Sequence, residues 1–336
     1  MATYDPGSAA AMQRSVQNLR PLSIGELIDR AFSICFRHLL AFMALSLVVI
    51  APQLIVSYLG AKGPLDMVWQ QIGALQQAST GSAPVLDPTQ LMQAYANATP
   101  YFLISFAIGL LFVPLSNAAV VSGISRAYLG MPVRFADCYR DAVPRWLSLI
   151  LLGLLWLLAA GVTMIATSIA FAVFFGATAA AGASLGSAGV VVAIIFSILV
   201  GIAIIVVGLA IYLAAVFSFV AAVLEGLGAD AAFGSGFRRV FGEGQFWRSL
   251  GIAASVVGIS FGFWIVGAVL GSVVIATTHS LSFQLVVSSV INAFLYPFIF
   301  AVVAVGYYDV RIRREGYDLQ MLASQLGANQ PAAPSP

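Results

Sequence analysis

Long runs of residues without a charged side chain constrain what this chain can fold into, and three of them carry the argument. The first holds 24 residues between Arg37 and Lys62, the second 79 residues from 146 to 224, and the third 60 residues from 249 to 308. An α-helix rises about 1.5 Å per residue, so about 20 apolar residues cross a hydrocarbon core roughly 30 Å thick. The sequence therefore predicts an integral membrane protein.

The composition agrees with this class and argues against two others. Charged residues make up 8% of the 336 and hydrophobic residues 61%, whereas about a quarter of a typical globular protein is charged. A soluble globular fold is thereby excluded. The net charge of +2 is too small to indicate a nucleic-acid surface, so the expected partner is the lipid bilayer and no nucleic acid.

The charge pattern predicts an all-α, polytopic membrane protein with six transmembrane helices. The second and third runs are too long for one crossing and carry arginines on both flanks, so each should cross an even number of times. The Gly/Ala/Ser-rich residues 176–189 are the expected turn in the second run. The predicted spans cover about residues 38–60, 100–125, 146–175, 190–224, 249–276 and 283–308.

The arginines predict the orientation of these spans. All fourteen arginines fall in segments that six crossings place on one side, and Lys62 alone falls on the other. Because cytoplasmic loops carry an excess of basic residues, both termini are expected in the cytoplasm. The arginines expected to anchor the chain at the membrane surface include Arg30, Arg37, Arg140, Arg145, Arg238, Arg239, Arg248 and Arg311.

An amphipathic helix is predicted just before the first span. Ser23 and Glu26 match a capping box, which places the helix start at Ser23. Leu27, Ala31 and Cys35 then recur at helical spacing. We expect this helix to lie at the membrane surface, with its apolar face toward lipid and its charged face toward water.

The order of interfacial helix, span, turn and span occurs three times. The copies start near Ser23, Val133 and Asp230, and Asp230 is the expected cap of the third helix. Cys138 falls on the apolar face of the second helix, as Cys35 does on the first. The pattern predicts three cytoplasmic-side interfacial helices in a three-fold internal repeat, and function often lies at the interface between such repeats.

The rest of the chain divides into tails and one polar loop. Residues 1–20 are expected to be a flexible N-terminal tail, residues 21–320 the six-span membrane domain, and residues 321–336 a disordered C-terminal tail. Residues 62–100 form the long polar loop. Apolar residues at helical spacing behind Pro64, and a cap with a first-turn proline at 87–88, predict a hairpin of two short helices on the membrane surface.

No constellation for catalysis or for holding a metal stands out. His38 and His279 have no carboxylate or cysteine at triad or ligand spacing, and Cys35 and Cys138 form no CxxC pair. We therefore predict no catalytic residue, no cofactor site and no metal site.

Polar residues inside the spans are the more informative candidates. Burying an amide in lipid without a partner is unfavourable, so such residues tend to face other helices. Packing between helices and contact with a substrate are both compatible with this position. The candidates are Asn117, Gln284, Asn292 and Tyr296.

Two stretches of the chain resemble a known bacterial family. They are residues 20–32, RPLSIGELIDRAF, and residues 307–319, YYDVRIRREGYDL. They are similar to the membrane domain of glycerophosphodiester phosphodiesterase, and this chain looks like a stand-alone member without the hydrolase domain. The resemblance implies a six-helix domain in the bacterial inner membrane, but no enzymatic activity, because the chemistry of that enzyme belongs to the separate hydrolase domain.

The function predicted from the sequence is that of a non-catalytic integral membrane protein, a scaffold or a partner subunit. The alternative is a transporter or a lipid-handling protein with a cavity between the repeats, and an intramembrane enzyme comes third. The expected partners are lipids and other membrane proteins. A filled core favours the scaffold, and a continuous polar-lined cavity favours transport.

Overall fold

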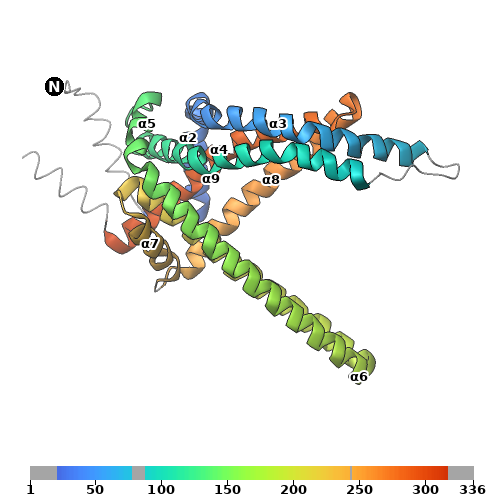
Figure 1. Ribbon diagram of the computed structural model, residues 1–336. Coiled ribbons are helices and arrows are strands. Elements are labelled where there is room, and N and C mark those ends of the chain that lie inside the picture. The colour runs from blue at the N-terminus through green and yellow to red at the C-terminus, as the bar shows by residue number, and fades with distance from the viewer. Residues whose placement is uncertain (1–20, 78–87, 243, 317–336) are drawn as a thin grey trace, which may run out of the picture. The chain divides into compact units, whose positions relative to one another are not determined.

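The computed structural model describes residues 21–77, 88–242 and 244–316. Within these ranges the chain is helical and contains no strand (Figure 1). The elements in order are α2 (Ile24–Arg37), α3 (Leu39–Gln77), α4 (Pro88–Tyr128), α5 (Phe135–Ala142), the 3-10 turn η1 (Val143–Arg145), α6 (Trp146–Glu225), α7 (Ala229–Phe241), α8 (Phe246–Thr278) and α9 (Leu281–Glu315).

Six helical segments of the described chain are long and apolar enough to cross a membrane, which confirms the predicted fold class. They are Leu39–Gln70, Met92–Tyr128, Phe135–Phe174, Ala188–Glu225, Phe246–Thr278 and Leu281–Arg314. The third runs from α5 through η1 into α6, and the fourth is the second half of α6. Between them α6 leaves helical geometry at Gly186, where φ is 63°. This reversal lies inside the predicted turn, and the rings of Phe174 and Phe196 pack across the two halves at 5.4 Å.

The described helices fall into two compact units. The first contains the chain up to Trp146 and from Ser255 onward, and the second contains Leu147–Ala254. Elements α2, α5 and α7 occur where the three interfacial helices are predicted. Their position at a membrane surface, and the internal repeat, stay predictions.

A buried carboxylate joins the two ends of the first unit. Asp309 in α9 is fully covered, and its Oδ1 accepts the Leu22 backbone N–H at 2.8 Å. The Arg313 guanidinium donates from Nε to Oδ2 of Asp309 at 3.1 Å and from Nη2 to the Leu22 carbonyl at 3.0 Å. These bonds fix the chain just before α2 against the end of α9.

Helix α2 begins as predicted. Ser23 is its N-cap, and the reciprocal bonds of the capping box are present between Ser23 and Glu26. The expectation that its apolar face lies on lipid is wrong, because α9 covers that face. Leu27, Ala31 and Cys35 are fully buried, and the Cys35 thiol donates to a backbone carbonyl of α9 at 3.3 Å.

The predicted hairpin of two short surface helices in residues 62–100 is wrong. Helix α3 continues unbroken through Pro64 to Gln77, and α4 starts at Pro88, so the two expected short helices are extensions of the first two spans. The apolar residues that follow Pro64 keep helical spacing, and one proline removes only one hydrogen bond, so the helix can continue. The Ser282 hydroxyl also donates to Asp66 in this extension at 3.0 Å.

The second unit packs α7 on the second half of α6. Gly236 in α7 lies so close to α6 that an added Cβ would overlap the Ser218 hydroxyl and the Ala214 carbonyl oxygen. Arg239, predicted as a surface anchor, is instead buried and pairs with Glu225 at 2.7 Å.

The predicted cap of α7 is also wrong. Gly228 is the N-cap, and its carbonyl accepts the Ala232 N–H at 2.8 Å. Asp230 lies inside the first turn, where a negative charge still suits the helix dipole.

The Asp309 interaction makes a testable prediction. Replacing Asp309 with alanine removes the acceptor of a buried N–H and of an arginine, so it should lower the free energy of unfolding by about 2–4 kcal/mol. The measurement is thermal or denaturant unfolding in detergent. Asp29→Ala, at an exposed carboxylate of α2, is the control and should change stability little. Equal stability of the two variants would contradict the anchoring role.

A pair of glycines in α7 makes a second prediction. Gly236→Ala forces a methyl group into α6, and overpacking of this kind costs about 1–3 kcal/mol. Gly234→Ala is the matched control, since no heavy atom of the surroundings lies within 4 Å of a Cβ there. It should stabilise the helix by about 0.5–1 kcal/mol. Melting temperatures of the two variants should therefore move in opposite directions, and a shared direction would refute the close approach.

Candidate functional site

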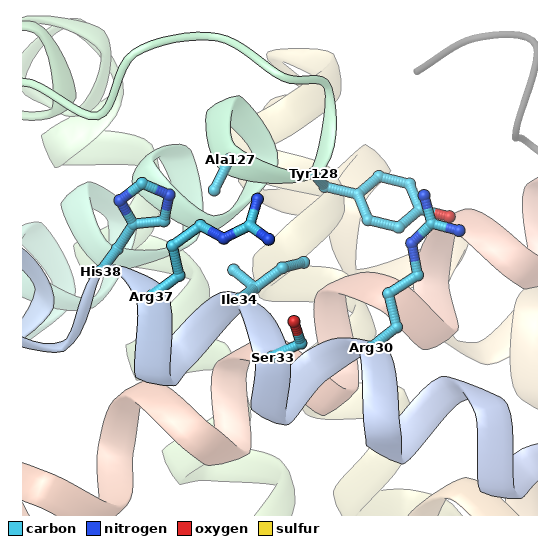
Figure 2. A pocket seen from close by; sticks show the side chains of 7 residues that line it. All are labelled: Arg30, Ser33, Ile34, Arg37, His38, Ala127 and Tyr128. Carbon is cyan, nitrogen blue, oxygen red and sulfur yellow. The ribbon is translucent and has the colours of Figure 1, made fainter. Parts of the chain in front are cut away.

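Three hollows in the first unit are the candidate sites. The one with the most charge, which we call the basic hollow, has a volume of about 240 Å³ and lies between α2 and the end of α4. Figure 2 shows its side chains. They are Arg30, Ser33, Ile34, Arg37, His38, Ala127 and Tyr128.

The position of Arg30 in this hollow follows from a stack of aromatic rings. Its guanidinium lies 5.0 Å above the centre of the Tyr128 ring, an arrangement in which the ring face attracts the cation. Tyr128 stacks in turn on Tyr308 of α9 at 5.1 Å. The Tyr308 hydroxyl shares a hydrogen bond of 2.7 Å with Ser125, so the platform under Arg30 is fixed from two helices.

His38 closes the other end of the basic hollow. It is the C-cap of α2, where its backbone N–H donates to the Ile34 carbonyl at 3.2 Å. Partial burial, and then the charge of Arg37, lower the pKa of His38 below its usual 6.5. The imidazole is therefore neutral at neutral pH, and it can donate or accept a hydrogen bond.

The largest of these three hollows lies between α8 and α9 and has a volume of about 620 Å³. Its wall is mainly aromatic and aliphatic, with the amides of Gln284 and Asn292 as its polar groups together with two serines. We call it the amide hollow. Gln284 packs closely on Gly271, where a Cβ would lie 3.0 Å from the Gln284 Nε2.

A third hollow of about 190 Å³ lies between α9 and α3. Asn292 and Tyr296 line it from α9, and Gln53 and Ser57 line it from α3. Ser57 shares a hydrogen bond of 2.6 Å with Ser105 of α4. Asn292 thus lines both this hollow and the amide hollow.

The structure brings together three of the four predicted intramembrane polar residues. Gln284, Asn292 and Tyr296 follow one another along α9 and line the hollows. Asn117 is half-buried in α4 and lines none of these three hollows. Whether these amides pack or bind stays a prediction.

The predicted arginine anchors have different environments. Arg30 and Arg37 share the basic hollow. Of the other anchors, Arg140 and Arg238 are exposed, Arg145, Arg248 and Arg311 are half-buried, and Arg239 is buried.

Sequence reasoning missed several residues of these sites. Tyr128 and Tyr308 support Arg30 from two helices, and Gln53 lines a hollow from α3. Gln53 could have been found, since it is an amide inside a predicted span. The tyrosine stack could not, because it joins positions 180 residues apart.

Metal ligation has no visible basis in the described residues. Within them, no group of three His, Cys, Asp or Glu side chains is placed to hold a metal ion. Both cysteines are buried and free, and burial raises the pKa of Cys35 to about 12, which keeps its thiol protonated and unreactive.

The fold and its hollows define a multi-pass helical membrane protein. The chain belongs to the family described as Domain of unknown function (DUF8558), whose model matches residues 12–327. No curated protein and no solved structure matches the chain. The family match does not link it to the membrane domain of glycerophosphodiester phosphodiesterase, so that resemblance stays a prediction.

Proposed function

We propose that this protein is a non-catalytic membrane protein, a scaffold or partner subunit of the bacterial inner membrane with both termini in the cytoplasm. The observation that carries the proposal is a pair of uncovered glycines in α8. Gly258 and Gly262 are exposed one helical turn apart, and no heavy atom of the surroundings lies within 4 Å of a Cβ at either. This spacing lets two membrane helices approach closely.

The burial of the spans supports the same proposal. The most apolar part of α9 is 44% buried, whereas that of α8 is only 6% buried. Within the first unit, helix α8 therefore leaves most of its surface uncovered. In the first unit the buried polar groups, Asp309 and Cys35 among them, are already engaged in structural hydrogen bonds.

The topology can be tested with introduced cysteines, because the native ones provide a silent background. Cys35 and Cys138 are fully buried and should not react with a maleimide on either side. Gly25 and Thr89 are both exposed. With cytoplasmic termini, Thr89→Cys should label in intact cells with an impermeant maleimide that reaches the outer face, and Gly25→Cys only after the cells are opened. The reverse result would invert the topology.

The scaffold role can be tested by photo-cross-linking in cells. A photoreactive residue at Ile265, three residues after Gly262 on the same helix face, should give a protein adduct of one defined mass. The double variant Gly258→Leu, Gly262→Leu should abolish that adduct, because larger side chains keep the partner helix away. The matched control is Gly153→Leu, Gly161→Leu in α6, where there is also open space. Adducts with lipid alone would refute the scaffold.

Lipid handling is the second candidate, and the amide hollow favours it. That hollow is apolar enough for an acyl chain, and Gln284 and Asn292 could receive a polar group. In the same experiment, a photoreactive residue at Ser288 in the hollow should then yield a lipid adduct.

A further inference from the structure

We propose that the basic hollow is a binding site for a phosphate ester anion, supplied by a membrane lipid headgroup or by a soluble phosphate ester. This site goes beyond the scaffold role and does not depend on it. The argument rests on the charges of the hollow, on the way Arg30 is held, and on the depth at which the hollow lies.

The lining of the hollow carries positive charge without a negative counterpart. Arg30 and Arg37 both face it, and its seven lining residues include no carboxylate. Within the described residues neither arginine has an ion-pair partner, in contrast to Arg126, which pairs with Asp141 at 2.8 Å. A guanidinium offers donors in a fork that matches phosphate oxygens.

The surroundings of Arg30 hold it ready for a ligand. Figure 2 shows its guanidinium beside the Tyr128 ring, with the Arg37 side chain extending above Ile34 toward Ala127. Because Tyr128 is itself buried and stacked on Tyr308, the platform cannot turn away. Less side-chain entropy is then lost when an anion binds, which favours affinity. Ser33 and His38 add further hydrogen-bonding groups to the same hollow.

The hollow lies at the ends of two helices that are apolar enough to span a membrane, which puts it near the level expected for lipid phosphates. It sits where α2 ends and α3 begins, and where α4 ends. The spans Leu39–Gln70 and Met92–Tyr128 terminate there, so the hollow marks the boundary of the apolar core. Anionic headgroups gather at this boundary and attract basic residues.

Two histidine signals allow the site to be tested directly. The chain has only two histidines, so labelling with ¹³C-histidine gives one NMR signal from His38 and one from His279, the internal reference. The charged or titratable groups facing His38 in the hollow are Arg30 and Arg37 of α2 and Tyr128 of α4. A bound anion should raise the pKa of His38, whereas His279, which lies between α8 and α9, should not respond.

The titration compares nanodiscs of phosphatidylcholine with nanodiscs that also contain phosphatidic acid. Two further titrations add a soluble ligand, inorganic phosphate or glycerol 3-phosphate, to the phosphatidylcholine nanodiscs. If the pKa of His38 rises only with phosphatidic acid, the ligand is a lipid headgroup. If it rises with the soluble ligands, the ligand is a free phosphate ester. Either result supports the site. No response of His38 in any arm would overturn it.

Charge variants separate a built site from general attraction. Arg30→Gln, Arg37→Gln should weaken binding about tenfold or more, as expected from the loss of charge-assisted hydrogen bonds. For each variant, the quantity compared is the change in the pKa of His38 when the ligand is added. The starting pKa itself cannot be compared, because loss of the Arg37 charge alone raises it. Arg140→Gln, Arg145→Gln removes the same charge outside the hollow and should keep the parental affinity. Equal losses in the two double variants would show unspecific attraction and refute the proposal.

A steric variant keeps the test decisive if the first double variant does not fold. Ser33 is exposed and lines the hollow, so Ser33→Trp should fold, retain both arginines and block the space between them. It should abolish the response of His38 to the ligand. Unchanged binding by this variant would exclude the hollow as the site.

Discussion

The first unit depends on the burial of one carboxylate. An unpaired charge in a dry interior is strongly unfavourable, so the partners of Asp309 have to be in place whenever the unit is folded. These partners are the Leu22 N–H and the Arg313 guanidinium. A single side chain thereby joins backbone at one end of the described chain to the last helix, across 287 positions of sequence.

The basic hollow is a consequence of this connection. With Leu22 held on α9, helix α2 starts at a fixed place and with a fixed rotation, which turns Ala31 and Cys35 toward α9. Residues one or two positions away on the helix then face elsewhere, and Arg30 and Arg37 come to lie beside the end of α4. The arginines of the basic hollow and the residues buried against α9 therefore lie on two different faces of α2.

The helices could be predicted from the sequence, but the contacts between them could not. Charge-free length, the Ser23 capping box and the turn at Gly186 are local properties, so the six spans and the start of α2 were predictable. An amphipathic pattern states that a face is apolar but not what covers it, which is why lipid was expected where α9 lies. Asp309 directly follows the third charge-free run, and no local pattern indicates its role, because its partner Leu22 is remote in sequence. The two stretches that carry the family resemblance are the ones that this bond joins.

Helix α9 combines a closed half with an open half. Residues 301–310 are buried without exception, and this half carries Asp309 and Tyr308. The other half carries Gln284, Asn292 and Tyr296, which line one hollow against α8 and one against α3. A ligand or a neighbouring helix that fills those hollows would reorganise only the loosely packed half. The tightly packed half would still hold α2, so the basic hollow would keep its shape while the other end of the same helix adapts to its surroundings.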